Sequence, residues 1–441
     1  MGNPILKTDS YKSSHFSQIP PEIKYVSSYI EARGGGYDRI LFNGLQGFLK
    51  TSGLLNQHLS WPKINKAEKT FTEHGEPFSG AWMDLLRMNF PIQIRALPEG
   101  MIVPPQTPLL EIRNTDPRFP WLPQYIETQL LRAIWYPTTV GSRSNKIRQI
   151  IKKAMMQSCD TLNGLSFKLH DFGARGVSSS ESAAIGGTAH LLNFMGTDTT
   201  ESIEYAQEAY NSPMAGFSIP AMEHSTVTSW CRNREVDAYR NFLNKFGGPG
   251  KLIAAVSDSY NIYHAVSHIW GKELKEEVIN SGTKVVIRPD SGIPEVMVVE
   301  VLRMLEESYG VSKNTKGYNF LNPAVGVIQG DGIDEHSIQK IIDAVHADKF
   351  SMDNVGFGMG GQLLQGLNRD TSKFAMKASA VSKDGISWIP IGKDPVTDSG
   401  KKQKMGLIDD PRFETVYLNG KSFLDSTLES IRQKVWNQDI A

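Results

Sequence analysis

A unit that occurs four times in the C-terminal half constrains the fold of this chain more than any other feature. Each copy is a short apolar run that stops at an aspartate or at glycines, and the copies lie at 253–258, 285–292, 325–332 and 355–361. Helical patterns follow at 262–279, 294–309 and 335–345, where Pro294 suits a first helical turn and Asp334 an N-cap. Strands that alternate with helices are typical of parallel βα units, whose functional residues gather at the carboxyl ends of the strands. We therefore expect an α/β fold with an irregular (β/α) barrel that is closed or nearly closed.

The two ends of the chain have a different, mainly β pattern. Apolar and polar residues alternate at 92–96, a turn is expected at 98–100, and a second apolar run lies at 109–112. Near the other end, Asp384-Gly385 and Asn419-Gly420 each separate two apolar runs, as in β-hairpins. We expect a mainly antiparallel β domain with helices from residues 1–140 and 378–441, and a barrel domain from residues 141–377.

Helical spacing also predicts three helices outside the repeated units. One apolar stripe runs from 121 to 135 and is expected to end at Pro137, and a second helix follows at 147–154. The last helix is expected to begin at a capping box formed by Ser426 and Glu429.

The composition excludes several classes of protein. The 441 residues contain 47 Lys and Arg and 47 Asp and Glu, so there is no overall charge to attract nucleic acid or an anionic membrane. Cys159 and Cys231 are the only cysteines, which is too few for a disulfide framework and favours a reducing compartment. No run of about 18 apolar residues occurs. We expect a soluble, cytoplasmic protein that binds neither nucleic acid nor a membrane.

Charged residues at the ends of the predicted strands are the first candidates for a functional site. Asp258, Asp290 and Asp331 occupy successive strand ends, and carboxylates suit either a polyol or a magnesium ion. One such aspartate alone is usually a helix cap. Three of them on one rim, beside Arg288, favour a site.

Glycines after the fourth strand are a second candidate. Gly360 and Gly361 let the backbone approach an anion and Arg369 could add a full charge, although a tight turn without a ligand explains the glycines equally well. No metal site is expected among the ten histidines. His264 and His268 are four residues apart but lack the adjacent glutamate of a zinc protease motif.

The densest polar cluster in the barrel region lies at 168–176. Phe172, beside glycines and Arg175, suits a flat heterocycle next to an anion, and the alternative is a buried phenylalanine at the end of a strand. Glu223-His224 places a carboxylate next to an imidazole in the sequence. Such a histidine is, however, more often a structural hydrogen-bonding residue.

Together with shorter motifs elsewhere, these residues resemble the nicotinamide phosphoribosyltransferase family. The matching segments are 8–12 (TDSYK), 42–46 (FNGLQ), 114–117 (NTDP), 169–179, 196–199 (GTDT), 223–226 (EHST), 256–260 (VSDSY), 288–292 (RPDSG), 329–332 (QGDG) and 367–370 (LNRD). They occur in the same order along essentially the whole chain. That agreement is far more specific than any single motif.

The resemblance implies a reaction and a set of partners. In this family the pyridine nitrogen of nicotinamide displaces pyrophosphate from C1 of phosphoribosyl pyrophosphate, which gives nicotinamide mononucleotide for NAD salvage. The resemblance also implies Mg²⁺ bound with the pyrophosphate group, ATP as a coupled substrate, and a homodimer with active sites at the subunit interface. Phe172 and Tyr11 would sandwich the pyridine ring, with Tyr11 from the other subunit. Asp198 would accept a hydrogen bond from the carboxamide.

The same resemblance assigns the remaining site residues, none of them to a metal. Arg288 and Asp290 would bind the ribose and its substituents, and Arg175 would lie near the pyrophosphate. The residues implied for the sugar and its 5-phosphate are Gly330, Asp331, Gly360, Gly361 and Arg369. Further cations implied across the interface are Arg33, Lys377 and Lys401. His224 matches the histidine that this family phosphorylates with ATP, with Asp258 close enough to orient it.

Two departures from the family pattern and three alternative functions stay open. The chain has Ala174 where well-known animal members carry tyrosine, and the loop after Arg33 is shortened to residues 34–37. A nicotinate phosphoribosyltransferase is the nearest alternative, but Asp198 would repel a carboxylate substrate. A non-catalytic binding protein on the same scaffold would have lost ligand-facing residues, which are present here. A magnesium-dependent barrel enzyme of another type rests on the strand ends alone.

Overall fold

The chain folds into two compact units, which we call the β unit and the barrel unit. The computed structural model describes residues 2–51, 55, 59–397 and 403–438. The β unit consists of Met1–Ser142, Glu204–Pro213 and Leu367–Ala441, and the barrel unit of Arg143–Ile203 and Met214–Gly366. Two of the borders fall within helices, α3 (Leu122–Ser158) and α5 (Thr200–Tyr210), and the other two fall after Pro213 and Gly366. No helix in the described part of the chain is long and apolar enough to span a bilayer.

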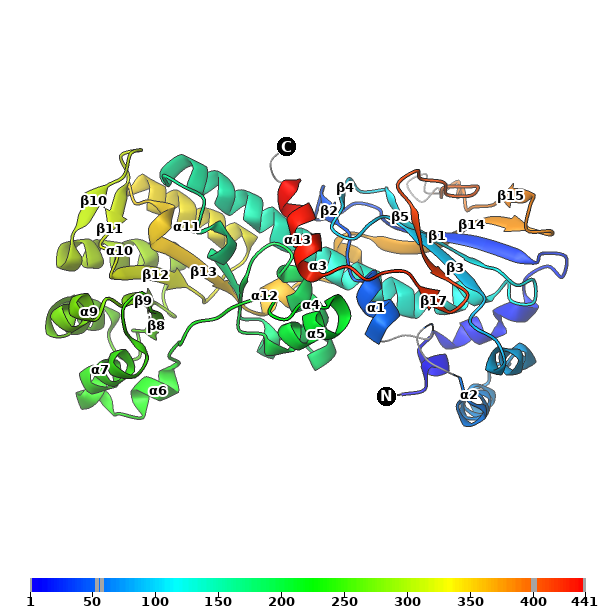
Figure 1. Ribbon diagram of the computed structural model, residues 1–441, viewed down its shortest axis with the longest axis horizontal. Coiled ribbons are helices and arrows are strands. Elements are labelled where there is room, and N and C mark those ends of the chain that lie inside the picture. Colours follow the sequence, from blue (N-terminus) through cyan, green and yellow to red (C-terminus); the bar gives the residue numbers. More distant parts are fainter. Residues whose placement is uncertain (1, 52–54, 56–58, 398–402, 439–441) are drawn as a thin grey trace. The chain divides into compact units, whose positions relative to one another are not determined.

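A six-stranded parallel sheet forms the centre of the barrel unit, and its strands β8, β9, β12 and β13 are labelled in Figure 1. The strand order is β7-β6-β13-β12-β9-β8. The strands are β6 (Leu169–Asp171), β7 (Gly196–Thr197), β8 (Leu252–Val256), β9 (Lys284–Arg288), β12 (Val325–Gln329) and β13 (Val355–Met359). β12 is buried along its whole length, as expected for a parallel sheet covered on both faces. The four predicted strands are confirmed.

A segment without regular secondary structure joins the two edges of this sheet. Phe217 bridges to Gly196 of β7, and Ala221 bridges to Ala254 of β8, both in parallel orientation. Main-chain hydrogen bonds accompany both bridges. Residues 217–221 therefore close the curled sheet into an irregular barrel, which confirms the expected fold class.

Helices connect the strands on the outside of the sheet. α10 (Pro294–Tyr309) and α11 (Glu335–Ala347) follow β9 and β12 at the predicted positions and pack against each other (Figure 1). Asp334 caps α11 as predicted, because its carboxylate accepts the N–H groups of His336 and Ser337. The remaining elements of this unit are α4 (Ser180–His190), α6 (His224–Thr228), α7 (Glu235–Phe246), α12 (Gly361–Leu364), β10 (Val311–Lys313) and β11 (Asn319–Leu321).

The prediction of a single helix at 262–279 is wrong. The structure has α8 (Ile262–His264), a π-helical stretch (Ala265–Glu273) and α9 (Lys275–Ser281). Within the π-helical stretch Trp270 is buried, and its Nε1–H donates to Ser257 Oγ at 3.2 Å. Apolar periodicity in the sequence does not distinguish this wider helix from an α-helix.

A seven-stranded antiparallel sheet forms the β unit, in the order β15-β14-β1-β5-β3-β16-β17. Its strands are β1 (Tyr25–Ala32), β3 (Ile92–Ala96), β5 (Pro108–Asn114), β14 (Phe374–Ser382), β15 (Trp388–Pro390), β16 (Glu414–Leu418) and β17 (Lys421–Ser422). The predicted hairpins at Asp384-Gly385 and Asn419-Gly420 are confirmed. Asn419 and Gly420 both have the positive φ that a two-residue hairpin turn favours.

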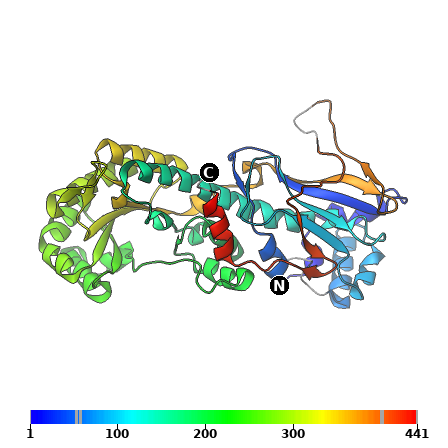
Figure 2. The same ribbon diagram turned by 45° about the horizontal axis from the view of Figure 1, so that its top comes forward.

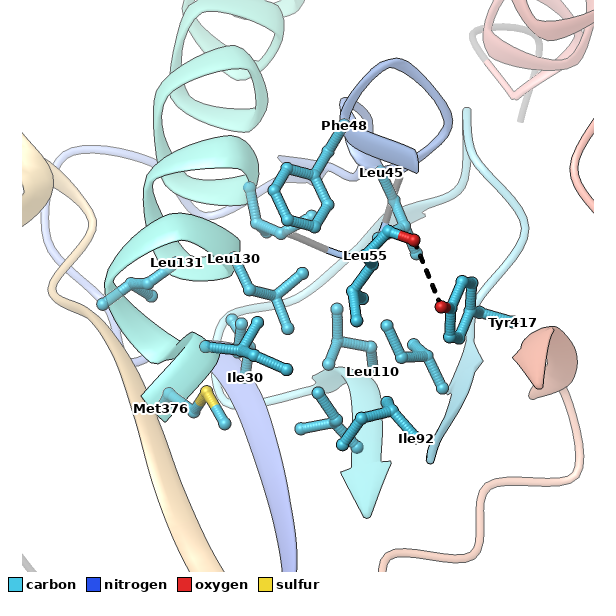
Figure 3. Close-up of a cluster of buried hydrophobic side chains, with 14 of the residues drawn as sticks. Ile30, Leu45, Phe48, Leu55, Ile92, Leu110, Leu130, Leu131, Met376 and Tyr417 are labelled. Carbon is cyan, nitrogen blue, oxygen red and sulfur yellow. Dashed lines mark hydrogen bonds between the residues drawn. The ribbon is translucent and has the colours of Figure 1, made fainter. Parts of the chain in front are cut away.

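One face of this sheet packs against α3 and enclosing helices to form the core of the β unit (Figure 3). Ile30, Ile92 and Leu130 come from β1, β3 and α3 and are fully buried. Tyr417 of β16 is also buried, and its hydroxyl donates to Leu55 O at 3.2 Å. Other elements here are α1 (Leu45–Thr51), α2 (Trp61–Glu73), β2 (Ile40–Leu41) and β4 (Ile102–Val103). Each large buried side chain stabilises the fold by about 1.5–3 kcal/mol relative to exposure.

The helix end expected at Pro137 is wrong. α3 runs unbroken from Leu122 to Ser158 (Figure 2), and Pro137 lies inside it by sequence position. Space for the proline ring comes from Gly44, where any Cβ would overlap Pro137. Asn43 Nδ2 donates to Pro137 O at 3.1 Å. Tertiary packing therefore overrides the local preference of proline for a helix end.

The last helix begins one residue later than predicted. α13 (Leu428–Asn437) is capped by Thr427, whose hydroxyl accepts the N–H of Ser430 at 3.2 Å. Ser426 is instead held by the side chain of Gln46, which accepts its N–H at 2.9 Å and donates to its carbonyl at 2.8 Å. This long-range contact is not visible in the local sequence.

Candidate active site

A cavity of about 410 Å³ opens at the carboxyl ends of the barrel strands. The predicted site residues that line it are Phe172, Arg175, Asp198, Arg288, Asp290, Gly330, Asp331, Gly360 and Gly361. They follow or end five strands, β6, β7, β9, β12 and β13, and all belong to the barrel unit. The parallel sheet is therefore what brings them together.

Phe172 forms one wall of the cavity and is held against glycine. Its N–H donates to Met359 O at 2.9 Å, and its ring lies over Gly358, where a Cβ would overlap the ring. A Cβ on Gly330 would also approach the ring, to 3.2 Å. The side chain is half-buried and lines the cavity, unlike the fully buried phenylalanine of the alternative interpretation. A flat aromatic wall of this kind suits a planar heterocycle.

Asp198 lies on another wall, directly after β7. Its N–H donates to Asp171 O at 2.9 Å, and its Oδ1 accepts a short hydrogen bond from the Ser218 hydroxyl. Within the described chain no hydrogen bond reaches Oδ2 of Asp198, so this oxygen can accept one from a ligand. Ser218 belongs to the segment 217–221 that closes the barrel. Sequence reasoning missed it because no local pattern marks that segment.

His170 and Ala174 line the same cavity beside Phe172. Burial lowers the pKa of His170, and the charge of Asp198 partly offsets this effect. His170 therefore presents a neutral imidazole at neutral pH. Ala174, the departure from the family pattern, is a small residue in the lining and leaves room where a tyrosine would stand.

Arg288 and Asp290 provide a charged pair at the end of β9. Arg288 Nε lies 3.4 Å from Asp290 Oδ1, an ion-pair distance without hydrogen-bond geometry. Arg288 Nε is buried and makes no hydrogen bond to any described residue. A buried cationic donor that makes no hydrogen bond is costly, and the ion pair with Asp290 compensates this cost only in part. This pair is thus suited to bind a group that carries hydroxyls or negative charge.

Two glycine turns complete the lining. Gly332, in the turn after β12, has a φ of 64°, which favours glycine. Gly361 begins α12 and packs on Gly176, where a Cβ would lie 2.6 Å from Gly361 Cα. Two main chains approach each other here without side chains between them. Their backbone can therefore come close to a bound anion.

His224 and Asp258 form a hydrogen-bonded pair next to Asp290. Asp258 Oδ1 is 3.0 Å from His224 Nε2, and Oδ2 accepts the Asp290 N–H at 3.0 Å and the Ser291 hydroxyl at 2.6 Å. His224 Nδ1 is 3.9 Å from Asp290 Oδ2. Burial raises the pKa of Asp258, but the hydrogen bonds from Ser291, His224 and the Asp290 N–H outweigh it and lower the pKa. The imidazole is 44% exposed and is oriented by a charged carboxylate.

The other predicted site residues belong to the β unit. Tyr11 is 55% exposed and lies in a 3-10 helix (Ser10–Ser17). Arg369 is exposed, and its guanidinium is 2.9 Å from Asp370. Lys401 lies outside the described residues.

Arg33 and Lys377 are part of a basic cluster in the β unit. Lys377 lies in β14, opposite Tyr29 of β1. Burial lowers the pKa of Lys377, Glu127 opposes this, and the nearby charges of Arg33, Lys393 and Lys12 lower the pKa further. Cations kept this close suit a phosphorylated ligand. Sequence reasoning missed Lys393, which lies in a loop without a recognisable motif.

No metal site is formed by the described side chains. Within the described residues there is no group of three or more His, Cys, Asp or Glu that could hold a metal ion. The rings of His264 and His268 stack at 4.9 Å, and His268 Nε2 lies 3.4 Å from Glu273.

Two family models match the chain. The nicotinate phosphoribosyltransferase (NAPRTase) family matches residues 167–422, which is more than half of the chain and covers the whole cavity. The N-terminal domain of nicotinamide phosphoribosyltransferase matches residues 3–90.

Full-length relatives and solved structures agree with these matches. The nicotinamide phosphoribosyltransferase of Xanthomonas campestris pv. campestris is 47% identical over 98% of this chain and 98% of that protein. The nicotinamide phosphoribosyltransferase of Acinetobacter baylyi is 30% identical over 99% of this chain and 97% of that protein. The crystal structure of human nicotinic acid phosphoribosyltransferase has the same fold, with a TM-score of 0.60 at 16% identity and coverage of 98% and 93%. The chain is therefore an enzyme of the nicotinate phosphoribosyltransferase (NAPRTase) family.

Proposed function

We propose that the protein is a nicotinamide phosphoribosyltransferase, which forms nicotinamide mononucleotide and pyrophosphate from nicotinamide and phosphoribosyl pyrophosphate. One observation carries the proposal: a single cavity combines the aromatic wall of Phe172 and the acceptor Asp198 with the charged pair of Arg288 and Asp290. The first two groups suit a planar carboxamide, and the second two suit a phosphorylated ribose. Relatives named nicotinamide phosphoribosyltransferase match this chain almost end to end.

The chemistry needs positioning and charge stabilisation more than a protein nucleophile. Displacement at the anomeric carbon develops positive charge on the sugar and negative charge on the departing diphosphate. Asp290 and Asp331 would lie beside the ribose, and Arg175 and Arg288 beside the phosphates. Mg²⁺ bound to the diphosphate would neutralise charge on the leaving group. The hard oxygen donors of Asp290 and Asp331 in the same cavity fit such an ion, and the diphosphate would supply its remaining ligands.

Asp198 favours the amide over the acid. With Ser218 donating to Oδ1, the free Oδ2 can accept an N–H from the carboxamide of nicotinamide. Nicotinate offers no such donor and would bring a second negative charge next to this carboxylate. Nicotinate phosphoribosyltransferase is the second candidate, because two solved structures of this fold are named for nicotinic acid or its nucleotide.

We also propose that ATP stimulates the reaction through phosphorylation of His224. The imidazole is accessible, and its Nε2 is held by Asp258, which leaves Nδ1 on the side of Asp290. A carboxylate that accepts the Nε2 proton fixes the tautomer and leaves the lone pair on Nδ1 as the nucleophile towards a phosphoryl group. Asp258 supports this role because three hydrogen bonds keep it charged.

A homodimer with shared active sites is the third part of the proposal. Phosphoribosyl pyrophosphate carries phosphates at both ends, whereas the cations in the described lining of the cavity are Arg175 and Arg288. The basic cluster around Lys377 and the exposed Tyr11 would complete the site from the β unit of the partner. Cytoplasmic location stays a prediction.

Mass-spectrometric detection of nicotinamide mononucleotide tests the proposed reaction. Purified protein is incubated with phosphoribosyl pyrophosphate, Mg²⁺ and either nicotinamide or nicotinate, each with and without ATP. We expect the nicotinamide product, a higher rate with ATP, and little nicotinate product. Equal or greater use of nicotinate would replace the proposal with the second candidate, and no product from either base would refute both.

Subunit complementation tests the shared site. Tyr11→Ala and Asp198→Ala are each expected to be nearly inactive, and mixing the two after mild dissociation should restore about a quarter of the wild-type activity, because half of the random dimers contain one intact site. A mixture that stays as inactive as its components would show that Tyr11 acts within its own subunit or not at all.

A further inference from the structure

Asp171, the last residue of β6, is a fully buried carboxylate behind the wall of the cavity. It does not line the cavity, in contrast to its neighbour Phe172. Its Oδ1 accepts the N–H of Gly173 at 2.7 Å. On the other side it faces α4, where a Cβ on Gly187 would lie 3.1 Å from Oδ2. The fold thus reserves a closely fitting space for this side chain.

The side chain and main chain of Asp171 reach both groups that are proposed to hold the base. The bond from Oδ1 to Gly173 spans Phe172 and forms a local turn that fixes the backbone on both sides of the ring. The carbonyl of Asp171 accepts the N–H of Asp198 at 2.9 Å. The hydroxyl of Thr199, the residue after Asp198, is buried close to the same carboxylate and helps to lower its pKa.

Burying a carboxylate in this position costs free energy, because its surroundings disfavour the charged form. Burial raises the pKa of Asp171 to about 6. The Gly173 N–H and the Thr199 hydroxyl lower the pKa, whereas the charges of Asp198 and Glu201 raise it further. No cation compensates it among these neighbours, and Oδ2 makes no hydrogen bond to a described residue. An apolar side chain of similar size could fill this buried space without the cost of burying a charge. We therefore infer that the carboxylate is present for its hydrogen-bond acceptor oxygen.

We propose that Asp171 is a positioning residue for the base: it holds Phe172 and Asp198 at the relative position that a pyridine carboxamide requires. This inference rests on the proposed function. Asp171 touches no substrate itself, and acts through the turn after Phe172 and the strand pairing before Asp198. Apart from Arg175, which follows the same strand, the residues proposed for the sugar and phosphate groups lie at other strand ends, so most of their binding does not depend on Asp171.

Steady-state kinetics of three variants test the inference. In Asp171→Ala the turn loses its acceptor, and we expect KM for nicotinamide to rise about 10- to 100-fold, as for a displacement of about 1 Å in a site. KM for phosphoribosyl pyrophosphate should stay within about twofold, because all of its proposed contacts except Arg175 lie at other strand ends. In Asp171→Asn the amide oxygen can still accept the Gly173 N–H, so KM for nicotinamide should return to within about threefold of wild type. Asp334→Ala removes a carboxylate helix cap elsewhere in the barrel unit and controls for general destabilisation.

The outcomes separate this inference from the proposed function. If the wild-type protein makes no nicotinamide mononucleotide, the proposed function is wrong and the role of Asp171 in binding the base falls with it. If it does, an Asp171→Ala variant with unchanged KM for nicotinamide, or with equal increases for both substrates, overturns the positioning role. An Asp171→Asn variant as impaired as Asp171→Ala also overturns it. If Asp171→Ala does not fold, Asp171→Ser takes its place, because the serine hydroxyl is a shorter acceptor. A KM for nicotinamide between that of Asp171→Asn and ten times the wild-type value would support the positioning role. A wild-type KM for nicotinamide in Asp171→Ser would contradict it.

Discussion

Replacing Asp171 with asparagine should stabilise the protein at neutral pH. The folded state raises the pKa of Asp171 from its ordinary value of 3.8 to about 6, chiefly because the carboxyl is buried. A shift of about two units corresponds to about 3 kcal/mol of unfolding free energy. Asparagine keeps the acceptor for Gly173 and carries no charge to bury. The variant is therefore expected to be more stable than wild type by up to about 3 kcal/mol at pH 7.5.

The pH dependence follows from the sign of the shift. Between about pH 4 and pH 6 the folded state binds a proton at Asp171 that the unfolded chain has already released, so rising pH removes stability from the wild type. Above about pH 7 the carboxyl is charged in both states and the loss is complete. The stability difference between Asp171→Asn and wild type should thus be small near pH 4 and should grow to its full size by about pH 7.

Urea-induced unfolding, followed by circular dichroism at several pH values between 4.5 and 7.5, measures this difference. Comparing variant and wild type at the same pH cancels the contribution of the β unit, which contains no part of this contact. Asp334→Asn, which changes a helix-cap carboxylate whose pKa is lowered in the folded state, is the control and should not become more stable relative to wild type as pH rises. A difference that is constant with pH, or an Asp171→Asn variant that is less stable at pH 7.5, would refute the reasoning.

Three further predictions concern activity. Asp198→Ala should reduce kcat/KM for nicotinamide by about 100-fold, since the hydrogen-bond acceptor for the carboxamide is lost, with KM for phosphoribosyl pyrophosphate nearly unchanged; unchanged nicotinamide kinetics would remove Asp198 from the base site. His224→Ala should keep basal activity and lose the rate increase with ATP, and a variant still fully stimulated by ATP would exclude the phosphohistidine. Gly358→Ala should displace the Phe172 ring, raise KM for nicotinamide and destabilise the fold by about 1–3 kcal/mol, as measured by kinetics and urea unfolding. Gly356→Ala in the same strand meets only Ile328 at 3.8 Å and should be near wild type, so equal effects of the two alanines would contradict the prediction.

The strand ends of the barrel could be predicted from sequence because each depends on local signals. An apolar run, a stop at aspartate or glycine, and a helix cap such as Asp334 all lie within a few residues of one another. Parallel topology then places those ends on one rim, so the sequence alone assigns Asp290 and Asp331 to a common site. The hairpin at Asn419-Gly420 could be predicted for the same reason.

Three features that could not be predicted from the sequence depend on contacts within the packed structure. Ser218 reaches Asp198 only because residues 217–221 close the barrel, and that segment has no strand pattern of its own. Pro137 continues a helix because Gly44 makes room for it. Asp171 stands in the sequence as one polar residue among several, and its burial against α4 follows only from the packed structure. Local patterns carry no information on such contacts.

The sugar end of the cavity and the proposed phosphohistidine share one loop. Asp290 lines the cavity, its N–H donates to Asp258 Oδ2, and its carboxylate lies 3.9 Å from His224 Nδ1. The Ser291 hydroxyl donates to the same oxygen of Asp258, whose other oxygen binds His224. A ligand that moves the backbone at Asp290 must therefore change the hydrogen bonds that orient His224, and a phosphoryl group on His224 must change the field at Asp290. Coupling between phosphorylation and sugar binding thus needs no distant conformational change, because a single carboxylate, Asp258, contacts both sides.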